Sequence, residues 1–189
     1  MKNNMKLIQK FLMIVMVMLA WSSITISAKG DKVDDNHLSC DGPYVIYLPD
    51  GGVRVVSVTV AGEVKDTTYA SLPDNFTLHV TDHEGNYPFD VRLHPVVRQE
   101  WKQSQAKKTF VMSDPHGRLN LVISLLQANG VIDSQLRWSY GDNQLVVIGD
   151  IFDRGYDVPQ IFWLFYKLEA EAAECGGRVS VMLGNHEPM

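Results

Sequence analysis

Three short polar segments each follow directly on an apolar run, and their side chains are of kinds that bind metal ions and phosphate. The segments are Ser113-Asp114-Pro115-His116-Gly117, Gly149-Asp150-Ile151-Phe152-Asp153-Arg154-Gly155 and Gly184-Asn185-His186-Glu187. Carboxylates and a guanidinium at the end of a buried strand destabilise a protein unless a partner compensates their desolvation. The types of these residues indicate what that partner is.

Four of these residues offer a mixed set of metal ligands. Asp114 and Asp150 supply carboxylates, His116 supplies an imidazole and Asn185 supplies an amide oxygen. This combination favours a divalent transition ion such as Mn, Fe or Zn over a calcium site built from oxygen atoms alone. A cation would also neutralise the carboxylates gathered in a partly buried cleft. We therefore predict that these four residues bind metal.

The remaining polar residues suit the hydrolysis of a phosphate ester. Arg154 presents a fork of donors that matches phosphate oxygens. His186 is a candidate general acid for the leaving alkoxide, and the Asp153 carboxylate is a candidate to orient its ring. Two metal ions about 3.5–4 Å apart clamp a phosphate and generate a nucleophile by lowering the pKa of a bound water. The charges at the strand ends are then tolerable because metal ions and phosphate lie among them.

The order of strands and helices explains how these segments meet. The apolar runs 109–112, 145–148 and 179–183 predict strands, and residues 119–129 and 157–175 have the apolar spacing of helices. Alternating strands and helices of this kind predict a parallel sheet in a βαβαβ arrangement. Ligands bind outside the carboxyl ends of the strands in such sheets. We therefore expect one functional edge.

The apolar positions within the two helices indicate which side chains are buried. The first helix carries Leu121, Val122, Leu125, Leu126 and Ala128 at helical spacing, and Asn129-Gly130 supplies its stop. The stripe of the second helix is predicted to lie in the core and consists of Ile161, Phe162, Leu164, Phe165 and Leu168.

Residues from about 40 to 95 are predicted to be β structure. Two hairpins are indicated, one around Pro49–Gly52 and one around Asp82–Asn86. The alternation from Val56 to Val60 predicts one buried and one solvated face. We expect a small antiparallel sheet, either as a separate module or packed on the α/β part, and a polar connector over Pro95–Lys108. The histidines of this region are predicted to be ordinary strand or loop residues.

The first 28 residues have the layout of a secretory signal peptide. Lys2, Lys6 and Lys10 form a basic region, Phe11–Trp21 is an apolar stretch too short for an ordinary membrane span, and a segment with small residues follows up to Ala28. The predicted organisation is a signal peptide over 1–28, a β-rich module over 29–105 and an α/β domain over 106–189. We expect an exported protein, periplasmic or secreted, with no stable membrane span after cleavage; an uncleaved N-terminal anchor is the alternative.

The composition narrows the partners. The chain has 189 residues, 46% of them hydrophobic, and its net charge of −5 argues against nucleic acid as a partner. Cys40 and Cys175 are its two cysteines, and in an exported protein they either pair or remain two free thiols.

Together the three segments resemble the successive signatures of the calcineurin-like metallophosphoesterase superfamily. The DRG and GNHE forms are similar to its protein serine/threonine phosphatase branch, including the Shewanella-like phosphatases. Each segment alone is also typical of a polar turn, whereas three in this order, about 35 residues apart and each at a strand end, form a specific pattern. The resemblance implies a metallophosphoesterase-type αββα sandwich, here a truncated βαβαβ half, preceded by the antiparallel β module.

The resemblance also implies a role for each matching residue. Asp114 and His116 would bind a first divalent ion and Asn185 a second, with Asp150 bridging the two. His186 would be the catalytic acid paired with Asp153, while Arg154 and Asn185 would contact the substrate phosphate. The implied reaction is direct in-line attack on phosphorus by metal-bound hydroxide, without a phosphoenzyme.

The match covers about residues 109–187, roughly half of a family domain, and the family supplies further metal-binding histidines from later in the domain. None of His37, His79, His83 and His94 lies where those ligands belong. Three functions are therefore considered: a phosphatase acting on a phosphoprotein, a nucleotide or another phosphomonoester; a truncated, inactive chain that acts at most as a binding module; and a phosphodiesterase of the same superfamily.

Overall fold

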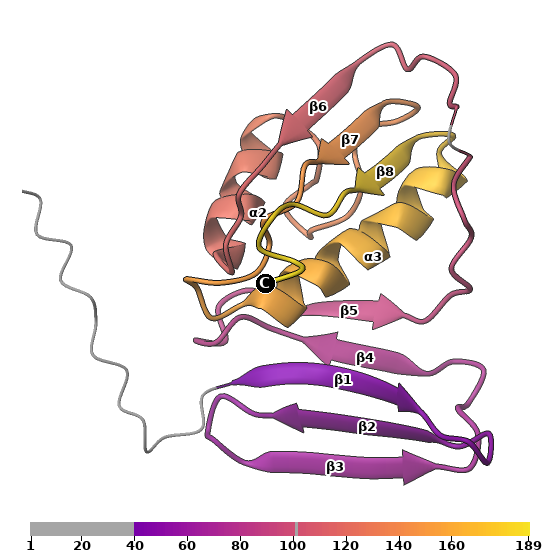
Figure 1. The fold of residues 1–189 in the computed structure, drawn as a ribbon, viewed down its shortest axis with the longest axis vertical. Coiled ribbons are helices and arrows are strands. Elements are labelled where there is room, and N and C mark those ends of the chain that lie inside the picture. The colour runs from indigo at the N-terminus through magenta and orange to yellow at the C-terminus, as the bar shows by residue number, and fades with distance from the viewer. Residues whose placement is uncertain (1–39, 101) are drawn as a thin grey trace, which may run out of the picture. The chain divides into compact units, whose positions relative to one another are not determined.

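The computed structural model describes residues 40–100 and 102–189, and its order of elements follows the predicted change from β to α/β structure (Figure 1). The proposed signal peptide lies outside the described residues, so export stays a prediction. Among the described residues, no helix is both long and apolar enough to cross a lipid bilayer.

The first part of the described chain is antiparallel β structure in two sheets. Strands β1 (Asp41–Tyr47), β2 (Val53–Val58) and β3 (Val64–Tyr69) form a three-stranded sheet in the order β1-β2-β3, and β4 (Thr77–Val80) pairs with β5 (Phe89–Arg92). Both predicted hairpins are present.

Three details of this part differ from the prediction. There are two sheets rather than one, and β3 was not predicted, because its sequence Val-Lys-Asp-Thr-Thr-Tyr is almost wholly exposed and has no apolar alternation. The expected buried face over Val56–Val60 is also wrong. These residues are half-buried or exposed, since β2 is covered only partly on either side.

The second part of the described chain is the expected βαβαβ unit. Strands β6 (Thr109–Met112), β7 (Gln144–Val147) and β8 (Arg178–Val181) form a parallel sheet in the order β6-β7-β8. Helix α2 (Leu119–Ala128) and helix α3 (Val158–Glu174) are the two crossovers. The limits of these three strands and two helices agree with the predicted ranges to within two residues.

The buried stripe of α2 differs from the one predicted by spacing. Leu119, Val122, Ile123 and Leu126 are buried, whereas Leu121 is 58% exposed and Leu125 is 42% exposed. The helix carries more apolar positions than its buried face needs, so spacing alone did not decide between two neighbouring stripes. The stripe of α3 is as predicted, with Phe162 at its partly buried margin.

One hydrophobic core joins the two parts. Leu78, Val80, Phe89 and Val91 of the β4–β5 hairpin belong to the same buried cluster as the helices and the parallel sheet. Polar contacts reinforce this packing: Trp163 Nε1 of α3 donates to the Pro43 carbonyl at 2.7 Å. Of the two arrangements considered for the β structure, packing against the α/β part is the one found. The exact boundary at residues 105/106 stays a prediction.

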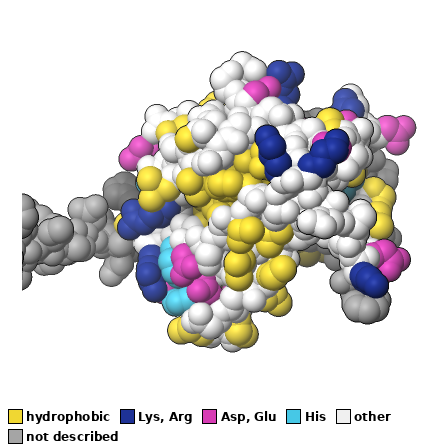
Figure 2. Space-filling model, turned by 90° about the horizontal axis from the view of Figure 1, so that it is seen from above, with side chains coloured by type: hydrophobic (Ala, Val, Ile, Leu, Met, Phe, Trp, Pro, Cys, Tyr) yellow, Lys and Arg dark blue, Asp and Glu magenta, His cyan; other side chains and the backbone are white. Residues whose placement is uncertain are grey.

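One face of the parallel sheet is open to solvent. Val111 is 51% exposed, Ile148 48% and Met182 50%, and by strand register and alternation all three point away from the helices. Figure 2 shows hydrophobic side chains gathered on the surface close to acidic and histidine side chains. Because parallel sheets are usually covered on both faces, this exposed area is a self-association risk for the chain.

Two leucines of α2 distinguish the stripe that stabilises the fold from its exposed neighbour. We expect Leu126→Ala, at a fully buried position, to lower the free energy of unfolding by about 2–5 kcal/mol, because it removes buried methyl groups and leaves a cavity. Leu121→Ala in the same helix is the matched control and should change it by no more than about 0.5 kcal/mol. Urea unfolding followed by circular dichroism measures both. Equal losses would mean that the buried face is assigned wrongly.

Candidate metal and phosphate site

The loops after β6, β7 and β8 meet at the carboxyl edge of the parallel sheet, as expected. Backbone hydrogen bonds join the first two loops: Asp114 N donates to the Gly149 carbonyl at 3.2 Å and His116 N to the Asp150 carbonyl at 3.0 Å. The second and third loops approach so closely that a Cβ on Gly149, whose φ is +77°, would lie 2.0 Å from Gly184 N. Only glycine fits at that position.

His116 is prepared to bind a cation. The residue is 6% exposed, and its Nδ1 lies 2.8 Å from the Phe152 carbonyl. A carbonyl can only accept, so Nδ1 carries a proton, and in the neutral ring Nε2 keeps its lone pair. That Nε2 atom is buried and has no hydrogen-bond partner among the described residues. A buried, unpartnered lone pair is costly unless a ligand satisfies it.

Further ligand atoms surround this nitrogen. One ligand atom from each of His116, Asp150 and His186 lies within 4.8 Å of the others. The Asp114 Oδ1 atom lies 3.6 Å from His116 Nε2. This donor set of imidazole and carboxylate fits a divalent transition ion. Asn185 directly precedes His186 and is exposed, and its amide makes no hydrogen bond within the described part of the chain.

His186 occupies a position that allows two roles. Its Nδ1 lies 3.6 Å from Asp153 Oδ2, which is the pairing predicted for a general acid and the carboxylate that orients it. Its ring also stands at 88° to the His116 ring with 4.8 Å between centroids, within the group of ligand atoms. The backbone N–H of His186 donates to Asp150 Oδ1 at 2.9 Å, so the third loop is tied to this carboxylate.

Arg154 is an exposed residue within the second loop. Its backbone N–H donates to Asp153 Oδ1 at 2.8 Å. Within residues 40–100 and 102–189, its guanidinium has no carboxylate or carbonyl partner, so its donors are available to an external oxyanion.

The backbone of the site is strained. Six non-glycine residues of the described chain have positive φ, and five of them are predicted site residues. These are Asp114 (+55°), His116 (+43°), Asp150 (+55°), Asp153 (+73°) and Arg154 (+71°). Such conformations cost about 1–2 kcal/mol per residue and persist only where the surroundings enforce them.

Glu187 is the enforcing residue that sequence reasoning missed. Its Oε1 accepts from Ile151 N at 2.6 Å and from Phe152 N at 3.4 Å, and its Oε2 accepts from Asp150 N at 2.9 Å and from Gly184 N at 2.5 Å. Burial opposes ionisation of this carboxyl, but these backbone hydrogen bonds together outweigh it and lower its pKa. The residue was visible in the third segment, yet its type alone did not distinguish a positioning role from a polar turn.

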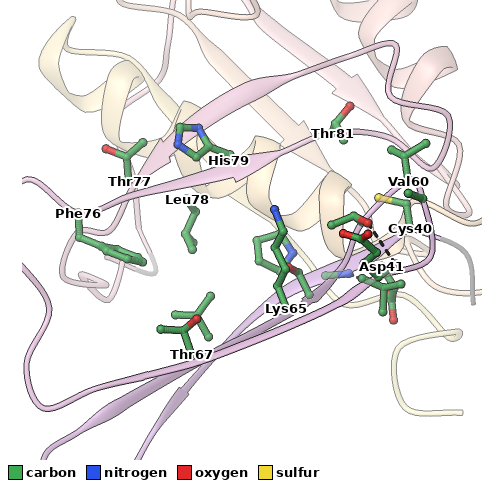
Figure 3. Close-up of a pocket in the computed structure, with 18 of the residues that line it drawn as sticks. Cys40, Asp41, Val60, Lys65, Thr67, Phe76, Thr77, Leu78, His79 and Thr81 are labelled. Carbon is green, nitrogen blue, oxygen red and sulfur yellow. Dashed lines mark hydrogen bonds between the residues drawn. The ribbon is translucent and has the colours of Figure 1, made fainter.

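The structure also has a cavity in the β-rich part, which is another place where a ligand could bind. A volume of about 570 Å³ opens between the β1–β3 sheet and β4, and Figure 3 shows Cys40, Lys65, Phe76 and His79 among the side chains around it. Within the described residues, the grouping of metal-ligand atoms lies at His116 and not here. Both cysteines are free thiols, and burial, with the nearby Asp157, Asp41 and Asp82 carboxylates, raises the pKa of Cys40. The candidate site is therefore placed at the strand-end loops.

We expect Glu187→Gln to lower the free energy of unfolding at neutral pH by about 1–3 kcal/mol, since an amide nitrogen would face backbone N–H groups that now share a carboxylate. Because the folded state lowers this pKa, the carboxylate's contribution is complete above the ordinary value of 4.5 and is lost as the pH falls through the lower folded value. Urea unfolding at several pH values measures both effects. Glu174→Gln, at an exposed position, is the control. If the difference in unfolding free energy between Glu187→Gln and wild type does not become smaller in acid, the stabilising role of the ionised carboxylate is contradicted.

Comparison with known proteins agrees with this geometry. A family model described as calcineurin-like phosphoesterase matches residues 107–189. Shewanella-like protein phosphatase 2 of Arabidopsis thaliana is 36% identical over 83 residues, which are 44% of this chain and 21% of that protein. Shewanella-like protein phosphatase 1 of Plasmodium berghei is also 36% identical over 83 residues, 43% of this chain and 23% of that protein.

The solved structures extend the likeness into the β-rich part. The cold-active protein-tyrosine phosphatase of a psychrophilic Shewanella species has a TM-score of 0.66 and 32% identity, over 79% of this chain and 44% of that chain. A mutant of a cold-active protein tyrosine phosphatase gives the same TM-score at 31% identity. The chain thus spans less than half of these structures and about a fifth to a quarter of the curated relatives. The 79% coverage confirms a metallophosphoesterase-like α/β fold with an antiparallel part at its N-terminal side. Residues 107–189 therefore match the calcineurin-like phosphoesterase family and, among its members, resemble the Shewanella-like protein phosphatases.

Proposed function

We propose that the protein is a metal-dependent phosphatase that hydrolyses phosphomonoesters at the edge where the three loops meet. The single observation that carries the proposal is the buried, unpartnered Nε2 of His116, which is surrounded by carboxylate and imidazole ligand atoms. The relatives support the reaction class, since those named are phosphatases.

The proposed cofactor is a pair of divalent ions, Mn, Fe or Zn. Asp114, His116, Asp150 and Asn185 are the residues that would hold them. When bound, such ions polarise a phosphate ester and make a water molecule nucleophilic at neutral pH. The grouped ligand atoms of His116, Asp150 and His186, with the Asp114 carboxylate beside His116, support one ion, and the second ion would depend on Asn185 and the bridging role proposed for Asp150.

The residues of the chain would divide the remaining work. The unpaired guanidinium of Arg154 binds and orients the phosphate oxygens. The Asp153 carboxylate faces Nδ1 of His186 and fixes the direction of the ring, so that the other ring nitrogen delivers a proton to the leaving oxygen. Glu187 keeps Asp150 in its strained conformation throughout.

The proposed substrate is a phosphoprotein, and the observation that favours an aromatic phosphoester is local. Phe152 is 43% exposed and Tyr156 is 45% exposed, and these rings flank Asp153 and Arg154 in the second loop. Exposed rings beside a phosphate-binding arginine suit the ring of phosphotyrosine. The solved relatives described above, which are protein tyrosine phosphatases, support the same class.

A metal titration with a matched variant tests the proposed function. We expect the chain to bind two Mn²⁺ ions tightly by calorimetry and to hydrolyse 4-nitrophenyl phosphate faster than its bis-substituted diester. Asp150→Asn keeps the shape of the side chain and an acceptor for His186 N but removes the charge that would bridge two ions. It should therefore lose more metal affinity and activity than any other single change.

The outcomes separate the alternatives considered. Weak binding of a single ion without hydrolysis supports an inactive binding module instead. Faster hydrolysis of the diester supports a phosphodiesterase. Metal affinity and activity that survive in Asp150→Asn would contradict the two-ion site.

His186→Asn distinguishes the two roles open to this histidine. If His186 is the general acid, the variant should bind Mn²⁺ within about twofold of wild type, while kcat falls by roughly 10²–10⁴. The loss should be smaller for 4-nitrophenyl phosphate than for an alkyl phosphate, because nitrophenolate leaves without a proton. Loss of one bound ion per chain would instead identify His186 as a metal ligand, as its place in the ligand group permits.

A further inference from the structure

The second loop is held at both ends, and its two anchors come from different parts of the chain. Glu187 anchors the Asp150–Phe152 end. The other end reaches Asp157, the residue that precedes helix α3. The Asp157 side chain is only 4% exposed. Asp157 Oδ1 accepts from His83 N at 2.8 Å and lies 2.9 Å from His83 Nδ1. His83 belongs to the Asp82–Asn86 loop between β4 and β5, in the β-rich part.

The loop that carries His83 is itself rigidly built. Asp82 is 3% exposed, and its Oδ1 accepts from Asn86 N at 2.5 Å and from Tyr87 N at 2.9 Å. The loop therefore presents His83 from a closed turn. The His83 ring also packs against Tyr156, with 5.0 Å between ring centroids. His83 thus contacts two consecutive residues of the second loop from outside the α/β unit.

The anchor at Asp157 continues to the rest of the site. Asp157 N donates to the Gly117 carbonyl at 2.9 Å, and a Cβ on Gly155 would lie 2.3 Å from the same carbonyl oxygen. Between the two anchors lie Asp153 and Arg154, two consecutive non-glycine residues at positive φ. Arginine disfavours this conformation and aspartate only tolerates it, so the turn depends on what fixes its ends.

We propose that His83 is a positioning residue for the phosphate site: through Asp157 it holds the Asp153–Arg154 turn in the conformation that presents the guanidinium to substrate phosphate. The inference rests on the proposed phosphate-binding role of Arg154. It assigns the β-rich part a function, since one of its loops completes the positioning of a residue in the second loop.

Inorganic phosphate binding to the Mn²⁺-loaded chain is the first test. His83→Ala should weaken phosphate binding by roughly threefold to tenfold, a loss typical of one coupled contact, and leave Mn²⁺ affinity within about twofold. His83→Asn, whose side-chain amide can replace Nδ1 as donor to Asp157, should restore most of the affinity. In an Arg154→Ala background, His83→Ala should have no further effect.

The chain offers a matched control in the same hairpin. His79 also pairs with an aspartate, with Nδ1 2.5 Å from Asp90 Oδ1, but both side chains are largely exposed on the hairpin. His79→Ala should change neither phosphate nor Mn²⁺ binding. An equal loss of phosphate affinity in His79→Ala, or an undiminished effect of His83→Ala without Arg154, would overturn the positioning role.

A second measurement does not depend on phosphate. Amide hydrogen exchange in His83→Ala should accelerate at residues 153–157, while the amides of Asp150 and Ile151, which are bonded to Glu187, should remain as protected as in wild type. Unchanged exchange at 153–157 would overturn the inference whatever the phosphate result. If the wild-type chain binds no phosphate but exchange changes as expected, the proposed function fails and the positioning contact stands.

Discussion

The carboxylate of Glu187 is the interaction on which the site depends. Four backbone N–H groups from two loops converge on its two oxygens, and neither loop has a regular hydrogen-bonding pattern of its own at that point. Backbone donors buried without partners are costly, and Asp150 is held at a φ of +55° among them. One ionised side chain thus satisfies the donors and fixes the conformation of a central candidate ligand. Ligand geometry at this edge follows from that contact.

Much of this arrangement was predictable from the sequence because the strands and helices of the α/β unit have strong, separate signals. Apolar runs placed β6, β7 and β8, and their parallel pairing brought Asp114, Asp150 and His186 to one edge, as expected. The antiparallel part was less predictable. Strand β3 forms by pairing with β2 rather than by burying a face, and no local pattern reveals such a strand.

Contacts between segments far apart in the chain could not be predicted from the sequence, for a physical reason. The pair of His83 and Asp157 joins residues 74 positions apart, and neither residue type is unusual where it occurs. A histidine in a polar hairpin loop is ordinary until the loop is seen to pack on the start of α3. The same applies to His94, whose ring stacks on Tyr166 with 3.8 Å between centroids and anchors the connector to that helix. The positive φ angles of the site residues likewise cannot be predicted before the backbone conformation is known.

The separation between the two anchors of the second loop also sets an order on folding during synthesis. Ribosomes deliver the N-terminal side first, so the hairpin that carries His83 is available before α3 emerges to pack on it. Glu187 reaches the loop only after a further stretch of 36 residues beyond Ile151 has been added. During synthesis there is therefore an interval in which the hairpin and α3 have been made while Glu187 has not, so the acidic loop lacks one of its two anchors. The candidate metal ligands become a rigid set only when the Glu187 carboxylate has bound the backbone of the second loop.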